Sequence, residues 1–172
     1  MALAADARSR DDDLMASSFL PRLLAGTWFA AEIPAGPLAR FAKIGRLVDY
    51  PTGDVVVREG EPCREFGVVT SGRIAIRLGL PGDEDRTILT IEPGDVVGWS
   101  AVLPPGFATS TAVVVAHASV VAFDGVQLRT ALAADPELAA VVYQRLLASV
   151  ARRLTATRTQ LLDLYRPAGE PW

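Results

Sequence analysis

The stretch EPGDVVGWSAVLPPGFATSTAVVVA, from Glu92 to Ala116, decides how the rest of this chain is interpreted. A Pro-Gly-Asp turn leads into two valines, and Gly98 ends that strand. A Pro-Pro-Gly sequence then forces a loop before a β-branched, apolar run begins at Ala112. The pattern predicts a short element between two strands, with a glycine at its entrance. Backbone amides at such an entrance point outward and can hold an oxygen-bearing ligand.

This stretch resembles the phosphate-binding cassette of cyclic-nucleotide-binding domains, the sensor fold of catabolite-activator-type regulators. In that family the cassette reads Phe-Gly-Glu-x-Ala-Leu, then a loop, then Arg-x-Ala-x-Val-x-Ala. The matching positions are Val97, Gly98, Ala101, Val102, Ala112, Val114 and Ala116. The order of turns and strands resembles the family from about Leu20 to Tyr165. The resemblance implies a β-roll that follows a small helical cap.

Two cassette positions depart from the family pattern, and both are ligand contacts in the family. Trp99 replaces the ribose-binding Glu. Ser110 replaces the phosphate-binding Arg, or Thr109 does if the loop gap is placed differently. No Lys or Arg occurs between Arg86 and Arg129. Removing one partner of such a charged pair costs on the order of 3–5 kcal/mol, so nucleotide binding should weaken by roughly 10²–10³-fold or more.

The candidate ligand-binding residues belong to the cassette and the end of its loop. They are Gly98, Trp99, Ser100, Ala101, Val102, Thr109, Ser110 and Thr111. Trp99 either stacks on a flat ligand or fills the pocket. Three functions compete, in this order: a sensor of an atypical small-molecule effector that signals to an unidentified protein partner, a protein that binds cAMP or cGMP in an altered mode, and a ligand-free dimeric interaction module. No other cofactor is expected.

Short apolar runs separated by glycine turns predict a mainly β domain with flanking helices, a double-stranded β-helix or jelly roll. We expect strands at 55–57, 67–69, 74–76, 87–91, 113–115 and 120–123, with a turn at Thr70-Ser71-Gly72. The expected organisation is a disordered tail at 1–13, a helical cap and β-roll at 14–135, a long helix at 136–165 and a tail at 166–172.

The long helix begins well, because Asp135 can cap it and Pro136 suits its first position. Apolar residues at alternating steps of four and three form a heptad seam that predicts a homodimer. The seam residues are Tyr143, Leu147, Val150, Leu154, Thr157, Leu161 and Leu164. Thr157 either fixes the register, faces a ligand or is simply tolerated. A second stripe is expected to cover the roll, and the helix arginines are interpreted as a solvated face. The stripe is Leu138, Val142 and Leu146, and the arginines are Arg145, Arg152, Arg153 and Arg158.

Composition limits the possible partners and locations. The 172 residues are 50% hydrophobic and carry a formal net charge of −3, which does not favour a nucleic-acid partner. Only residues 166–172 follow the helix, too few for a winged helix, so no specific DNA binding is expected. We expect no signal peptide and no membrane span. The single cysteine, Cys63, fits a cytoplasmic location.

Catalytic sites find little support in the residue types present. A cupin-type metal site needs two or three histidines and a carboxylate, and His117 is the one histidine of the chain. Ser100 lacks a candidate base, and a chain with one histidine does not favour a Cys-His pair at Cys63. The sequence therefore predicts a regulator without catalytic activity.

Overall fold

The computed structural model describes residues 19–79 and 86–164, with side chains as far as residue 159. The two expected tails lie outside the described residues. Residues 19–25 form a helix. The labelled elements that follow are α2 (Ala35–Lys43), β1 (Gly45–Tyr50), β2 (Val55–Val57), β3 (Glu65–Leu78), β4 (Arg86–Ile91), β5 (Val96–Val97), the 3-10 helix η1 (Trp99–Ala101), β6 (Thr111–Asp124), α3 (Gly125–Ala134) and α4 (Pro136–Leu164).

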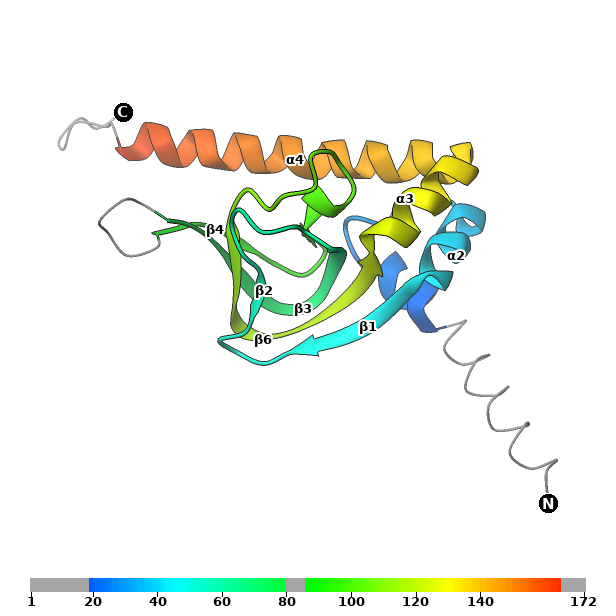
Figure 1. Ribbon diagram of the computed structural model, residues 1–172, viewed down its shortest axis with the longest axis horizontal. Coiled ribbons are helices and arrows are strands. Elements are labelled where there is room, and N and C mark those ends of the chain that lie inside the picture. Colours follow the sequence, from blue (N-terminus) through cyan, green and yellow to red (C-terminus); the bar gives the residue numbers. More distant parts are fainter. Residues whose placement is uncertain (1–18, 80–85, 165–172) are drawn as a thin grey trace, which may run out of the picture.

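The described strands form one antiparallel sheet that curls into a roll (Figure 1). The order is β1-β6-β3-β4, while β2 pairs with β6 and β5 pairs with β3. The helices flank this roll, and α4 runs along one side of it. The expected mainly β architecture with flanking helices is confirmed.

The two longest strands differ from the expected pattern. We expected separate strands on either side of Thr70-Ser71-Gly72, but β3 is continuous over 14 residues, and so is β6. The turn prediction is wrong because the glycine bends the ladder without ending it. Gly72 has φ 80°, and a Cβ there would overlap the carbonyl oxygen of His117 on β6. The register shifts on both sides of Ser71 mark this bend.

The core has two parts, because alternate residues of β3 and β6 point to opposite faces of the sheet. One face packs against the helices, where the rings of Phe41 and Phe123 stack with their centroids 4.1 Å apart. The other face fills the inside of the roll with Val69, Ile74 and Val120, among others. The cassette lies where these two clusters meet, since Val96 belongs to the first and Val97 to the second.

The long helix begins as the sequence predicts. The carboxylate of Asp135 accepts a hydrogen bond from the amide of Leu138 at 3.0 Å. This bond is the largest of the causes that lower the pKa of Asp135. The stripe expected to cover the roll is buried, with Leu138, Val142 and Leu146 each no more than 3% exposed.

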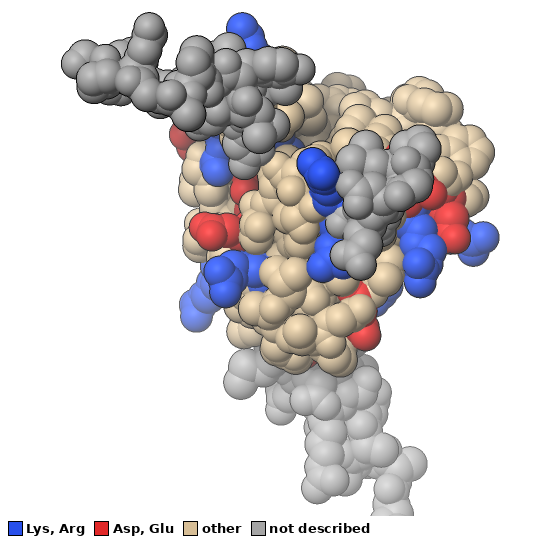
Figure 2. Space-filling model, turned by 90° about the vertical axis from the view of Figure 1, so that its left-hand side faces the viewer, with Lys and Arg blue, Asp and Glu red and all other residues tan. Residues whose placement is uncertain are grey.

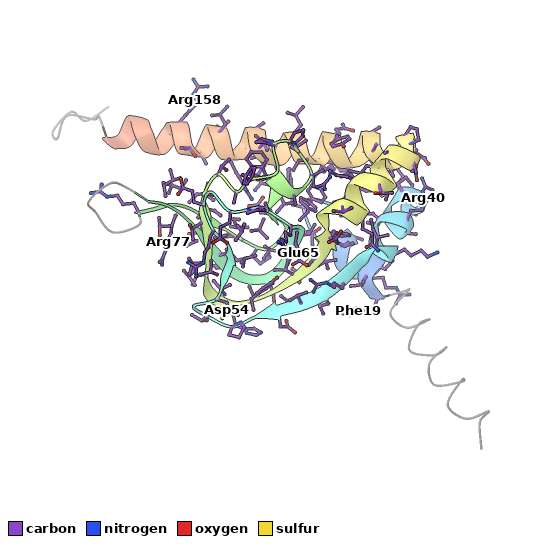
Figure 3. All side chains as sticks on the ribbon, viewed as in Figure 1. Phe19, Arg40, Asp54, Glu65, Arg77 and Arg158 are labelled. Carbon is purple, nitrogen blue, oxygen red and sulfur yellow. The ribbon has the colours of Figure 1, made fainter. Side chains whose placement is uncertain are left out.

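The interpretation of the helix arginines as a solvated face is wrong for Arg145 and Arg153, while Arg152 and Arg158 are exposed. Arg145 is 8% exposed and donates hydrogen bonds to the carbonyl oxygens of Trp28 and Phe29. Arg152 lies over the Trp28 ring, 4.0 Å from its centroid. Arg153 reaches the carbonyl oxygen of Val96. Their long stems pack on the roll while their charged ends find acceptors. Arg158 does point away from the roll, as expected (Figure 3).

Candidate functional site

The cassette has the backbone that its sequence predicts. Strand β5 ends at Gly98, whose φ of 69° and ψ of 32° are left-handed, and η1 follows immediately. A Cβ at Gly98 would overlap the carbonyl oxygen of Glu65 and lie 3.3 Å from Sγ of Cys63. Glycine is therefore required both for the conformation and for the close approach to β3. The first amides of η1 have no acceptor within that helix.

The structure divides the predicted site residues into two groups. Five of them line one small cavity beside the cassette, namely Gly98, Trp99, Ser100, Thr109 and Ser110, and we call this cavity the cassette corner. The other three do not line it. Ala101 and Val102 are buried in the core next to the helices. The hydroxyl oxygen of Thr111 accepts a hydrogen bond from the amide of Glu59 at 3.1 Å, which fixes the connection after β2.

The cassette corner is almost full. Its free volume is about 20 Å³, room for about one water molecule. Val57 and Ile76 close it from the roll interior, and Ala108 closes it from the loop. Trp99 is half-buried and also packs against the core that faces the helices. A site for a small organic ligand usually offers several hundred Å³.

Arg153 also lines the cassette corner, although it was not among the site residues predicted from the sequence. It lines the corner from α4, and its guanidinium donates to the carbonyl oxygen of Val96 in β5. Its Nε is buried and has no hydrogen-bond partner among the described residues. Burial lowers the pKa of Arg153, and the nearby Asp95 carboxylate opposes that effect. A cation therefore does lie at the cassette, although none is encoded in the cassette sequence.

Two larger cavities lie next to the cassette corner. One, of about 530 Å³, lies between β2, the connection from β2 to β3, and strands β3 and β6. It shares four lining residues with the corner, which are Val57, Cys63, Val97 and Gly98. The other, of about 630 Å³, lies between the cassette loop and α3. Cys63 lines all three cavities, and burial raises the pKa of its thiol.

The seam predicted on α4 is exposed in the single chain. The exposed fractions are 41% for Tyr143, 70% for Leu147 and 60% for Leu154. Val150 is half-buried and Thr157 is exposed, with its hydroxyl bonded to the carbonyl oxygen of Arg153 at 2.9 Å. The side chains of Leu161 and Leu164 lie outside the described residues. The partner of this seam stays a prediction.

Other candidate chemistry does not converge in the described part of the chain. His117 is exposed, and its Nε2 lies 3.9 Å from the carboxylate of Asp49. Within residues 19–79 and 86–164, no group of three or more His, Cys, Asp or Glu side chains is placed to hold a metal ion. None of the helices described there has the length and apolarity to cross a membrane. On the end of the molecule shown in Figure 2, basic side chains are interspersed with acidic ones.

A family model described as the cyclic nucleotide-binding domain matches residues 47–135. This match spans the roll from β1 to the cap of α4, and it includes the cassette with its required glycine. The chain belongs to the cyclic nucleotide-binding domain family. The resemblance noted from the cassette is confirmed.

Known proteins similar to this family member include a transcriptional regulator and a cyclic nucleotide-binding domain of solved structure. A CRP-like cAMP-activated global transcriptional regulator from Mycobacterium tuberculosis is 29% identical over 84% of this chain. The chain spans 63% of that relative's length. A cyclic nucleotide-binding domain from Methylobacillus flagellatus has a TM-score of 0.73 at 16% identity and covers 89% of this chain and 85% of its own.

A second similar solved structure is the regulatory subunit of a cAMP-independent protein kinase A from Trypanosoma brucei. Its TM-score is 0.65 at 14% identity, covering 76% of this chain and 47% of that one. A mutant of that protein with three substitutions, one of which introduces an arginine, is described as bound to cAMP. At these identities the two solved structures establish the fold alone.

Proposed function

We propose that this chain is a non-catalytic regulatory domain with a degenerate cassette. It binds an atypical small molecule and does not bind a cyclic nucleotide in the way that is usual for the family. The ligand-bound state is passed to a protein partner through a dimer formed by α4. The observation that carries the proposal is the cassette corner. Only about 20 Å³ is free there, and Arg153 of the domain's own helix takes part of the space.

The chemistry of the corner supports the same proposal. Ser110 is half-buried where the family places arginine, and its hydroxyl carries no charge for a phosphate. Trp99 offers a ring where the family places the carboxylate that binds ribose. The relatives include both a cAMP-activated and a cAMP-independent protein, so members of this fold differ in their response to the nucleotide.

The contact of Arg153 with β5 offers a route from the cassette to the helix. Its guanidinium joins α4 to Val96 of β5. Val96 is followed by Val97 and then by the cassette glycine, Gly98. Arg152 adds a second contact, 3.5 Å from the carboxylate of Asp95. A ligand that prefers a conformation with β5 displaced therefore changes the contacts that hold α4. The dimer seam continues on the same helix.

A second candidate function rests on the unpartnered Nε of Arg153. A cyclic nucleotide could bind after α4 moves outward, with Arg153 supplying the cation that the cassette lacks. The two candidates differ in the expected effect of Arg153→Ala on binding of cAMP. Binding should be lost if Arg153 holds the phosphate, and it should stay weak or improve if Arg153 only fills the corner.

Restoring the family contacts should restore nucleotide binding. Calorimetric titration of the wild type with cAMP or cGMP should give weak binding or none. The double variant Trp99→Glu, Ser110→Arg should bind at least about tenfold more tightly, because it supplies the phosphate fork and the ribose acceptor and removes a ring from the full corner. Micromolar binding by the wild type would contradict the proposal and favour the second candidate.

A matched variant tests the placement of the arginine. Thr109 also lines the corner, but its side chain is exposed, whereas Ser110 is half-buried. The variant Trp99→Glu, Thr109→Arg should therefore gain less than the variant with arginine at Ser110. A larger gain for the Thr109→Arg variant would mean that Thr109, and not Ser110, stands at the position of the family's arginine.

The dimer is tested at Leu154, the middle residue of the seven in the predicted seam. Leu154→Glu places two like charges in a parallel α4 seam and should raise the dimer dissociation constant at least about a hundredfold. Gln144→Glu adds the same charge at an exposed position outside the seam and should leave the dimer intact. Molar masses from light scattering of both variants decide. A dimeric Leu154→Glu protein would contradict the seam.

A further inference from the structure

The cavity of about 530 Å³ next to the cassette, which we call the roll-mouth cavity, has the size of a small-molecule site. Its inner wall is apolar and comes from three strands, with Val57 on β2, Val97 on β5 and Val120 on β6. The main chain of Gly67 completes this wall. Since the cassette corner is nearly full, this cavity holds most of the free space that borders the cassette glycine.

Two arginines at the mouth of this cavity are not held by any side-chain partner in the described part of the chain. Arg58 and Arg64 line it and have no ion-pair or hydrogen-bond partner among the described side chains. Two of the three carboxylates that line it are engaged. Glu65 pairs with Arg46, which does not line the cavity (Glu65 is labelled in Figure 3), and Asp124 accepts from the amide of Gln127 at 2.8 Å. The third carboxylate is Glu61, and no ion pair joins any of the three to Arg58 or Arg64.

One neutral polar group also lines the cavity. Tyr50 of β1 is half-buried, and its hydroxyl makes no hydrogen bond among the described residues. Burial raises the pKa of Tyr50, and the charge of Glu65 adds to that effect. The hydroxyl is therefore protonated at neutral pH and can donate to an oxygen of a ligand.

We infer that the roll-mouth cavity, and not the cassette corner, holds the effector of this domain, and that the effector is a small amphipathic monoanion. Its apolar body lies against the valines, and its carboxylate meets the guanidinium groups of Arg58 and Arg64. One carboxylate can accept hydrogen bonds from both of these guanidinium groups, since neither is engaged by another side chain in the described residues. The inference rests on the proposed sensor function and gives it a site and a class of ligand.

This placement also connects the ligand to the helix. A molecule in the cavity touches Val97 and Gly98, while the preceding residue, Val96, accepts the hydrogen bond of Arg153 from α4. Occupying the cavity therefore acts on β5 next to the residue that Arg153 contacts. The effector would influence α4 without entering the cassette corner.

Hexanoate is a suitable probe, with hexanol and hexylammonium as neutral and cationic controls of equal length. Binding is followed by calorimetry and by the NMR shifts of the valine methyl groups. Hexanoate should bind more tightly than either control and should shift the methyl signals of Val57, Val97 and Val120. The double variant Arg58→Gln, Arg64→Gln should weaken hexanoate binding at least about tenfold and leave hexanol binding unchanged.

Two further variants make the test specific. Arg73→Gln, Arg158→Gln removes the same charge from exposed positions that do not line the cavity, and it should leave hexanoate binding unchanged. Val56→Trp places a ring at the half-buried mouth and should block all three probes. The arginine variants change exposed side chains only, so they keep the test decisive if Val56→Trp does not fold.

Equal affinity for the three probes, or hexanoate binding that survives loss of Arg58 and Arg64, would overturn the inference. No binding of hexanoate to the wild type would overturn it as well. These outcomes differ from a failure of the proposed function, which would appear as tight cAMP binding by the wild type or as a dimer that survives Leu154→Glu.

Discussion

Replacing Arg145 with alanine should lower the free energy of unfolding by about 3–5 kcal/mol. Arg145 is 8% exposed, and its guanidinium donates to the carbonyl oxygens of Phe29, at 2.9 Å, and of Trp28, and to the carboxylate of Glu32. The variant leaves the carbonyl groups of Trp28 and Phe29 without this donor, at the contact between α4 and the segment that precedes α2. Urea unfolding followed by circular dichroism, at one protein concentration, measures the loss.

Arg152 is the matched control for this experiment. It lies on the same helix and over the same Trp28 ring, but its side chain is 50% exposed and its ion pair with Asp95 is 3.5 Å long. Arg152→Ala should cost no more than about 1 kcal/mol. Arg145→Met keeps most of the packed stem and should therefore lose less than the alanine variant. Equal losses of unfolding free energy for Arg145→Ala and Arg152→Ala would show that the buried hydrogen bonds to Trp28 and Phe29 do not hold α4 in place.

Replacing Gly98 with alanine should destabilise the domain by about 2–5 kcal/mol. A non-glycine residue in the left-handed conformation costs roughly 1–2 kcal/mol, and overpacking adds about 1–3 kcal/mol. At Gly98 both apply, because φ is 69° and a Cβ would overlap the carbonyl oxygen of Glu65. The same urea unfolding measures the effect, and the amide signals of η1 should shift because the cassette must move away from β3.

Gly60 separates the two causes. Its φ is 77°, close to that of Gly98, but a Cβ there would meet no atom within 4 Å. Gly60→Ala should therefore cost only the conformational part, roughly 1–2 kcal/mol. If both variants lost the same stability, the overlap of an added Cβ with Glu65 would cost nothing. Glycine would then be needed at position 98 for its backbone angle alone.

Local features of the sequence were sufficient for most of the fold. The Asp135 cap lies three residues before the amide that it accepts from, so its partner is encoded nearby. The stripe of Leu138, Val142 and Leu146 follows from the helical repeat, and its burial confirms the prediction. The glycine at the cassette entrance was also read correctly, because a short element after a strand needs a left-handed residue there.

The strand boundaries were harder to predict. The Ser71-Gly72 pair is typical of a turn, and the local sequence gives no reason to continue the strand through it. Pairing with β6 decides otherwise, since Arg73 and Ile74 find partners at Ala116 and Val114. A strand that is held by a neighbour on the same sheet bends at a glycine instead of ending there.

The sequence by itself determined the family, the roll and the absence of a cation from the cassette segment, since each depends on residues close together along the chain. Only the tertiary structure decided what occupies the site. Arg153 is far from the cassette in sequence, and the direction of α4 across the roll brings its guanidinium to Val96. The free volume of the cassette corner likewise depends on side chains from β2, β3 and α4 that pack together. Patterns along a chain report periodicity and turns, whereas the volume and charge of a site are sums over segments that meet only after folding.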